Sequence, residues 1–109
     1  VNVSSIAGRN KSIVSGVHYT ASKAGIIGLT KQFAHEVDDI NINCVCPSQT
    51  ITEMLEESMT KKEQLDLAVR IPLRRLATVQ EVVDPIMYLC SDKSSYIHGA
   101  CLDVNGGQL

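Results

Sequence analysis

Tyr19 and Lys23 are the residues of this 109-residue chain whose types and spacing most directly suggest chemistry. They lie four positions apart, at the start of a helical pattern, and Ser5 lies fourteen positions before Tyr19. Because residues i and i+4 share one face of a helix, the phenol and the ammonium can meet at one point. A phenol ordinarily has a pKa near ~10, and a cation within about 4 to 6 Å lowers it toward neutral pH. The pattern predicts proton transfer to a carbonyl oxygen or from an alcohol, with Ser5 orienting that oxygen.

Other motifs accompany the pair along the whole chain. They are Asn2-Val3-Ser4-Ser5-Ile6-Ala7-Gly8, Asn43-Cys44-Val45-Cys46-Pro47, Ile71-Pro72-Leu73 with Arg75-Leu76, Glu81-Val82, Leu89-Cys90-Ser91-Asp92 and Asp103-Val104-Asn105-Gly106-Gly107. Together they resemble the short-chain dehydrogenase/reductase family, specifically the catalytic half of its common single-domain type. The resemblance implies an α/β fold, the C-terminal half of a Rossmann-type doubly wound parallel sheet with three strands and crossover helices. Residues 1–109 would then form one partial domain.

The resemblance also implies roles for single residues. Tyr19 would be the acid/base, Lys23 would activate it and bind the nicotinamide ribose hydroxyls, and Ser5 would steady the substrate oxygen. The reaction would be hydride exchange between NAD or NADP and a ketone or secondary alcohol. Members of this type include 3-oxoacyl carrier-protein reductases and sugar, polyol or steroid dehydrogenases, and the motifs do not separate these substrates.

A second expected cofactor segment follows the central strand, at the edge where open α/β sheets hold their ligands. By resemblance, this loop begins at Pro47 and Ser48 and contacts the nicotinamide through the backbone of Thr50 and the hydroxyl of Thr52. Ser48 stands where the family usually has glycine. If the backbone there required a positive φ or a very close approach to the cofactor, serine would add strain of roughly 1 kcal/mol or more. A solvated Ser/Thr loop is the alternative interpretation.

The elements that must position these residues follow from hydrophobic periodicity and turn signals. We expect strands at 1–5, 40–46 and 100–104, helices at about 18–37 and 79–91, a polar loop at 6–17, and a charged, helix-prone lid at 54–69. Thr78 and Glu81 predict a capping box, and Pro85 predicts a bend or an early break in the last helix. A strand, a long helix and a second strand imply a parallel pair with a right-handed crossover.

The long helix at 18–37 has two distinct faces. We expect Ile26, Phe33 and Val37 to share a face with Tyr19 and Lys23. A second stripe consists of the small or polar residues Ala21, Gly25, Gly28 and Gln32. Glycine inside a helix costs about 1 kcal/mol relative to alanine, so the two glycines predict the close approach of another backbone. That neighbour is either part of this chain or, by resemblance, a second subunit of a homodimer or homotetramer.

Composition limits the partners. The net charge is −2, and the sequence has no basic stripe that would bind nucleic acid and no polybasic tract that would bind a membrane. No apolar run approaches the ~18 residues of a transmembrane helix, and the first residues do not have the pattern of a signal peptide. We therefore expect a soluble, cytoplasmic protein that acts on a small carbonyl or alcohol substrate.

Other chemistries fit less well. Ser5 lacks the flanking glycines of a hydrolase nucleophile elbow, and His18, His35 and His98 lack metal-ligand spacing. His18 could touch substrate or be a plain exposed residue, and Arg74-Arg75 could bind a phosphate or be solvated. The four cysteines, Cys44, Cys46, Cys90 and Cys101, match no zinc or disulfide framework, so we expect buried reduced thiols.

Two hypotheses about the protein remain. None of the seven glycines forms the G-x-G-x-x-G turn that binds a dinucleotide pyrophosphate, and the chain begins inside an alternating apolar stretch. We therefore expect a fragment. It is either the catalytic half of a nicotinamide-dependent oxidoreductase or a truncated, non-catalytic piece used only for assembly or binding.

Overall fold

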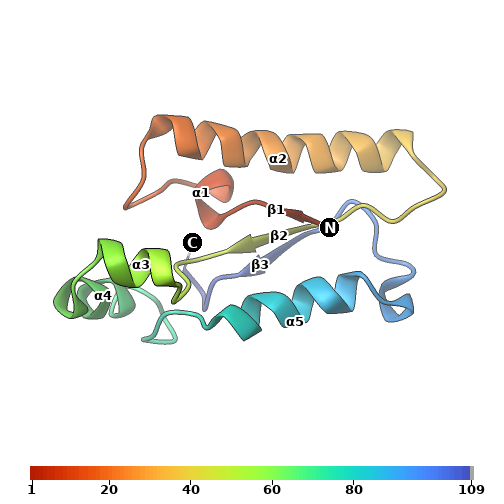
Figure 1. Cartoon of the computed structure of the whole chain (residues 1–109). Coiled ribbons are helices and arrows are strands. Elements are labelled where there is room, and N and C mark those ends of the chain that lie inside the picture. Colours follow the sequence, from red (N-terminus) through yellow and green to blue (C-terminus); the bar gives the residue numbers. More distant parts are fainter. Residues whose placement is uncertain (109) are drawn as a thin grey trace.

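The computed structural model describes residues 1–108, in which helices cover both faces of a small parallel sheet (Figure 1). The elements in chain order are β1 (Asn2–Val3), α1 (Ile6–Arg9), α2 (Val17–Glu36), β2 (Cys44–Pro47), α3 (Glu53–Ser58), α4 (Lys61–Ala68), α5 (Val79–Leu89), the 3-10 turn η1 (Asp92–Ser94) and β3 (Cys101–Val104). This is the expected partial α/β domain.

The sheet has the order β1-β2-β3, and both neighbouring pairs are parallel. Asn2 is paired with Cys44, and Cys44 with Cys101. The predicted strand at 40–46 is too long at its start, because residues 40–43 are outside β2. In that segment the side chain of Asn43 donates to the Ile97 carbonyl (2.8 Å) and accepts from Ala100 N–H (2.9 Å). β2 is covered on both faces, and its first three side chains are fully buried.

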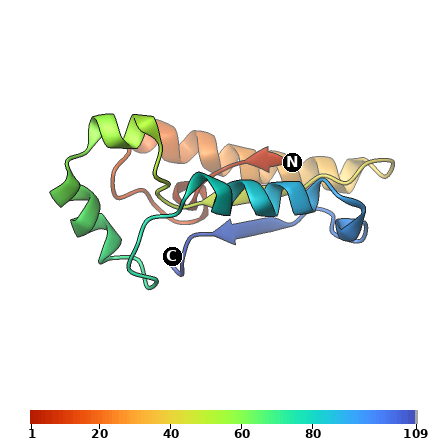
Figure 2. The same cartoon turned by 60° about the horizontal axis from the view of Figure 1, so that its bottom comes forward.

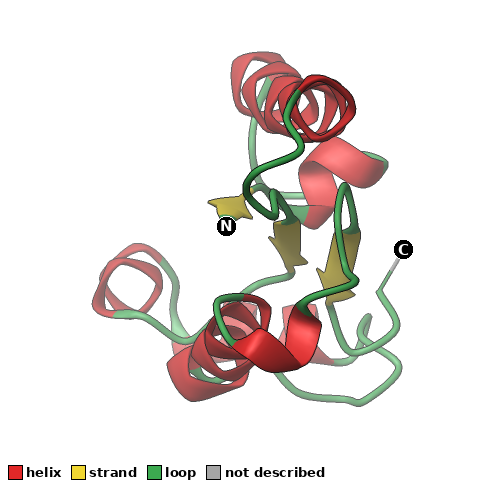
Figure 3. Cartoon of the chain, turned by 90° about the vertical axis from the view of Figure 1, so that its right-hand side faces the viewer, coloured by secondary structure: helices red, strands yellow, loops and turns green. Residues whose placement is uncertain are grey.

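The helices divide between the two faces of the sheet. Figures 1 and 3 show α1 and α2 on one face and α5 on the other. Figure 2 shows α3 and α4 beyond the carboxyl ends of the strands, where the predicted lid lies. The start of α2 and the loop after β2 therefore lie at the same end of the sheet, although they are far apart in the sequence.

The long helix α2 confirms the predicted one to within a residue at each end. Its one fully buried residue is Thr30, whose hydroxyl donates to the Ile26 carbonyl (2.8 Å) and accepts from the Asn2 side chain (3.0 Å). This contact ties α2 to β1. Phe33, which we expected on the face that carries Tyr19 and Lys23, is 47% exposed, although Thr30 three residues before it is fully buried.

The segment 6–17 is not only a loop, because it begins with the one-turn helix α1. Ser5 caps this helix by accepting a hydrogen bond from Ala7 N–H (3.1 Å), and Ile6 and Ala7 are buried. A helix of four residues is not stable alone, so packing rather than propensity forms it. That packing is not readable from local sequence.

The lid segment forms two helices rather than one. Thr52 caps α3, and Thr60 caps α4 with a full capping box to Glu63. A small apolar cluster holds the segment against the following loop; it contains Leu67, Ala68, Ile71 and Leu76, with Leu55 and Met59 packed on it. None of the helices in residues 1–108 combines the length and apolarity needed to cross a bilayer.

The last helix, α5, begins at the predicted capping box of Thr78 and Glu81. Of the bend or early break expected at Pro85, the early break is wrong, since the helix continues through the proline to Leu89. Proline removes one main-chain donor, yet the helix ends only at Leu89, which is buried. Asn105-Gly106-Gly107 forms the expected tight turn, with Gly106 and Gly107 at positive φ.

Candidate active site

Tyr19 and Lys23 meet as their spacing predicts. Helix α2 begins at Val17, so both residues lie in its first two turns, and Lys23 Nζ is 5.6 Å from the centre of the Tyr19 ring. The same ammonium donates a hydrogen bond to the Val3 carbonyl at the end of β1 (3.2 Å). The cation is therefore held between the sheet and the phenol, close enough for a cation–π contact.

Ser5 lies two residues after the end of β1 and caps α1. Its half-buried hydroxyl oxygen accepts from Ala7 N–H, and its O–H remains able to donate one hydrogen bond. A hydroxyl in this state is suited to an oxygen acceptor such as a carbonyl. The structure thus places Ser5 on a short helix that packs directly on α2.

Two residues that the sequence reasoning missed fix this packing. Gly8 lies so close to α2 that an added Cβ would come within 2.5 Å of the Lys23 carbonyl carbon. The buried Ser4 donates through its hydroxyl to the Lys23 carbonyl oxygen (2.6 Å). Both contacts hold the backbone of the residue that carries the ammonium. The motif around Ser5 contained both residues, but nothing in their spacing indicated a contact with Lys23.

Of the two neighbours expected at Gly25 and Gly28, a backbone of this chain is not the one. A Cβ added at Gly25 or Gly28 would meet nothing within 4 Å, so close packing within residues 1–108 does not explain them. Gly8 is instead the glycine whose Cβ would meet a neighbouring helix backbone. Helical periodicity locates a stripe, but it does not say which stripe faces a neighbour.

The predicted cofactor loop runs along the carboxyl edge of the sheet. Pro47 is the last residue of β2, and Ser48 N–H donates to the Val104 carbonyl (3.0 Å). Arg74 is the one non-glycine residue with positive φ in the described part of the chain, so the strain that a positive φ at Ser48 would cause is absent. Serine in place of glycine therefore costs no backbone strain here.

Thr50 and Thr52 differ in how much of their hydrogen-bonding capacity is used. Ala77 binds the neighbours of Thr50 on both sides, accepting from Ile51 N–H (2.8 Å) and donating to the Gln49 carbonyl (3.1 Å). Within residues 1–108, the N–H and C=O of Thr50 itself make no hydrogen bond. The Thr52 hydroxyl accepts from Leu55 N–H (3.2 Å) and keeps its own proton for donation.

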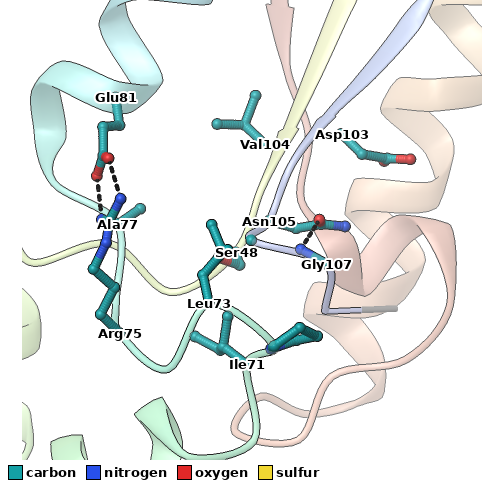
Figure 4. Close-up of a pocket in the computed structure, with 12 residues that line it drawn as sticks. Ser48, Ile71, Leu73, Arg75, Ala77, Glu81, Asp103, Val104, Asn105 and Gly107 are labelled. Atoms are coloured by element: carbon teal, nitrogen blue, oxygen red, sulfur yellow. Dashed lines mark hydrogen bonds and ion pairs between the residues drawn. The ribbon is translucent and has the colours of Figure 1, made fainter.

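A pocket of about 570 Å³ lies beside this loop, at the end of β3 (Figure 4). Ser48 lines it, but Ser5, Tyr19 and Lys23 do not, so it adjoins the predicted trio without containing it. Apolar side chains form much of its wall; they include Ile71, Pro72, Leu73, Ala77 and Val104.

One charged pair borders the pocket. Arg75 donates two hydrogen bonds to Glu81 (2.6 and 2.7 Å). These bonds, with the hydrogen bond from Thr78 N–H, lower the pKa of Glu81 to about 2. The guanidinium of Arg75 is thus already paired with a carboxylate, and the Arg74 side chain donates to the Val69 carbonyl (2.9 Å). A phosphate site at these two arginines is not favoured.

The cysteines are all free, as expected, but they are not all buried. Cys44 and Cys46 are fully buried in β2, whereas Cys101 is partly buried and Cys90 is exposed. Burial, with the neighbouring Cys44, raises the pKa of the Cys46 thiol to about 12. A thiol in this state is a poor nucleophile. His18 is exposed at the start of α2, which fits the plain interpretation.

Comparisons with known proteins identify the relatives of this chain. A sequence model of the family described as "Enoyl-(Acyl carrier protein) reductase" matches residues 1–108. The 3-oxoacyl-[acyl-carrier-protein] reductase of Thermotoga maritima is 40% identical over 98% of this chain and 44% of its own length.

Two solved structures from Brucella melitensis have the same fold. A 3-oxoacyl-[acyl-carrier protein] reductase superposes with a TM-score of 0.91 at 34% identity, covering 97% of this chain and 40% of the other. A second 3-oxoacyl-[acyl-carrier protein] reductase, with bound NAD, gives a TM-score of 0.82 at 37% identity over 97% and 38% of the two chains. The chain therefore spans less than half the length of the relatives it matches, and it belongs to the short-chain dehydrogenase/reductase family of oxidoreductases.

Proposed function

We propose that the complete protein exchanges a hydride between a nicotinamide cofactor, NAD or NADP, and a ketone or secondary alcohol. The observation that carries the proposal is the meeting of Lys23 Nζ with the Tyr19 ring on one face of α2, at 5.6 Å. When bound, a nicotinamide supplies the hydride in reduction and takes it up in oxidation. The residues of this chain would supply the proton and hold the substrate oxygen.

Each residue of the trio has a distinct part in that chemistry. The Tyr19 hydroxyl gives a proton to the carbonyl oxygen in reduction and removes it from the alcohol in oxidation. The Lys23 ammonium, held by the Val3 carbonyl, stabilises the phenolate form by its charge. Ser5 accepts from Ala7 N–H through one lone pair and donates its single O–H to the substrate oxygen.

The residues after β2 fit a nicotinamide. The free N–H and C=O of Thr50 are suited to a carboxamide, which needs one donor and one acceptor. Thr52 retains a hydroxyl proton, and Lys23 retains two ammonium donors beyond the one used by Val3. Pro47 and Ser48 set the start of this loop without strain. The NAD-bound relative supports a cofactor of this class, with NAD and NADP both open.

For the substrate, the similarity to 3-oxoacyl carrier-protein reductases makes a 3-oxoacyl thioester the first compound to try. Sugars, polyols and steroids form the rest of the panel. Consumption of NADH and of NADPH with each compound, followed by absorbance, would identify the substrate class and the preferred cofactor.

The decisive experiment replaces Tyr19 by phenylalanine in the complete protein. We expect turnover to fall by about 10²- to 10⁴-fold, the usual contribution of a general acid, while the affinity for NADH or NADPH is retained. Tyr96→Phe is the matched control, because Tyr96 is fully exposed and the same hydroxyl is removed. Turnover that survives Tyr19→Phe unchanged would exclude the proposed role.

The non-catalytic alternative, an assembly or binding piece, is favoured by one observation. Val1 and Val3, at the free side of β1, are each more than 40% exposed, as in a surface that binds another strand. The coding sequence before residue 1 distinguishes the two functions. A strand followed by Thr-Gly-x-x-x-Gly-x-Gly supports the oxidoreductase, and a start codon immediately before Val1 supports the alternative.

We also propose that the complete protein is a homo-oligomer that uses the outer face of α2. Gly25 and Gly28 open onto free space there, and the exposed apolar residues Val17, Leu29 and Phe33 lie on the same helix. Phe33→Glu should lower the mass measured by light scattering. An unchanged oligomer, or a monomeric parent protein, would refute this interface.

A further inference from the structure

Arg9 and Asp103 form an ion pair between elements that are far apart in the sequence. Arg9 Nε and Nη2 donate to Asp103 Oδ1 and Oδ2, both at 2.9 Å. The two side chains are only 33% and 24% exposed, so water screens the pair less than a typical surface pair. Two parallel bonds also fix the relative orientation of the partners, which a single contact does not.

The pair holds α1 at the end opposite to Ser5. Arg9 is the last residue of α1, Ser5 is its N-cap, and Asp103 lies in the middle of β3. Because α1 is one turn long, a rotation at Arg9 moves the Ser5 hydroxyl with it.

Contacts with both α2 and β2 hold the rest of α1. Gly8 packs against the backbone of Lys23, and Ser4 donates through its hydroxyl to the Lys23 carbonyl and through its N–H to the Val45 carbonyl (2.9 Å). These contacts fix the start and the middle of α1. The fork from Arg9 to β3 adds a directed contact at the last residue of α1.

We propose that Arg9 and Asp103 are positioning residues that set the direction of the Ser5 hydroxyl. The inference rests on the proposed function, in which Ser5 donates to the substrate oxygen. Neither residue touches the reacting atoms. Their effect on turnover passes through Ser5 and is absent when the Ser5 hydroxyl is absent.

A double-mutant cycle in the complete protein tests this coupling. Arg9→Met should lower kcat by about 10- to 100-fold, as misplacement of a catalytic group does, and leave KM for the cofactor unchanged. In a Ser5→Ala background the same change should lower kcat less than about 2-fold, since the hydroxyl it orients is gone. Arg9→Lys should recover little, because an ammonium has no planar fork. If Arg9→Met folds poorly, Asp103→Asn, which keeps the side-chain shape, takes its place in the double-mutant cycle.

Arg75→Met is the matched control, because Arg75 and Glu81 form the same kind of bidentate pair away from α1. Its effect on kcat, whatever its size, should be the same with and without the Ser5 hydroxyl. If the effect of Arg9→Met is equally independent of Ser5, the positioning role is overturned.

Amide hydrogen exchange provides a readout without turnover. The Ala7 N–H is bonded to Ser5 Oγ, so Arg9→Met should speed its exchange by about 10-fold or more, and Arg75→Met should not. Unchanged protection of Ala7 would also overturn the proposal. If the parent protein reduces no ketone of the panel, the proposed function fails, and the exchange result still decides whether Arg9 holds Ser5.

Discussion

At the scale of single residues, the geometry of the site depends on small side chains beside the reactive ones. Tyr19 and Lys23 could be located from spacing alone, because helical periodicity is a local property. Gly8 and Ser4 could not, since their partner is the Lys23 backbone, which only the tertiary structure brings near. The sequence therefore predicts the reacting groups better than it predicts the contacts that hold them.

Replacing Gly8 by alanine tests this dependence. The new methyl would have to lie 2.5 to 2.8 Å from backbone atoms of Lys23 and Ala24, which cannot move aside as a side chain can. We expect the free energy of unfolding of the complete protein, measured in urea, to fall by about 1 to 3 kcal/mol. Gly25→Ala, made in the Phe33→Glu background that removes the proposed subunit interface, is the matched control: it adds the same methyl to open space inside α2 and should raise stability by about 0.5 to 1 kcal/mol. Equal effects of the two variants would contradict the close contact.

Glu81 gives a prediction about pH. Hydrogen bonds from Arg75 first, and then from Thr78 N–H, lower the pKa of Glu81 from its usual 4.5 to about 2. A carboxyl with a depressed pKa stabilises the fold above its unfolded pKa, and that contribution disappears as the pH falls from 4.5 toward 2. The stability difference between the wild type and Glu81→Gln should therefore be constant near neutral pH and shrink below pH 4.5, as urea unfolding at a series of pH values would measure.

Glu57→Gln is the control for this pH series, because Glu57 lies exposed on α3. Its stability difference from the wild type should show no comparable shrinkage in acid. If the stability difference between the wild type and Glu81→Gln stays constant down to pH 3, the ion pair makes no contribution to stability that depends on the charge of Glu81.

At the scale of elements, local signals predicted helix starts well and strand limits poorly. The Thr78 capping box and the start of α2 were placed to within a residue, because caps are local hydrogen bonds. The helix α1 was missed, and β2 begins later than its apolar pattern. Both depend on what packs above and below them, which a single sequence does not display.

His98 links three segments of the chain, although its sequence position indicated no role. Its Nδ1 accepts from Ile42 N–H (3.1 Å), which requires the ring proton on Nε2, and Nε2 lies 2.7 Å from the Ala34 carbonyl and 3.2 Å from the Val37 carbonyl. The imidazole thus joins the end of α2 to the segment before β2 and to the segment before β3. Only the assembled fold brings these backbone groups together.

Replacing His98 by alanine should weaken the link between these three segments. We expect a loss of about 1 to 2 kcal/mol in the free energy of unfolding, the usual net value of one or two hydrogen bonds. Amide exchange at Ile42 should accelerate at the same time. His35→Ala, an exposed position on the last turn of α2, should change stability by less than about 0.5 kcal/mol. A His98 variant with wild-type stability and unchanged Ile42 exchange would show that these hydrogen bonds do not stabilise the fold.

At the scale of the whole molecule, residues 1–108 are elongated and have a small core. The radius of gyration is 14.6 Å, against about 13 Å for a compact domain of this length, and the extents are 47 × 29 × 23 Å. Eighteen large apolar side chains are exposed in the described part of the chain, while ten apolar residues are buried. The sheet has three strands, so β1 and β3 each present a free edge.

These features predict how residues 1–109 behave when produced alone. Parallel strands are normally covered on both faces and paired at their edges, so the free side of β1, with the exposed Val1 and Val3, should bind other copies. Light scattering should give a mass well above the 11.8 kDa of the chain, and turnover with NADH or NADPH should be far below that of the complete protein. Val3→Lys, which places a charge on the free edge, should reduce the association. A monomeric chain with turnover near that of the complete protein would show that these edges are tolerated and that the rest of the cofactor site is not required.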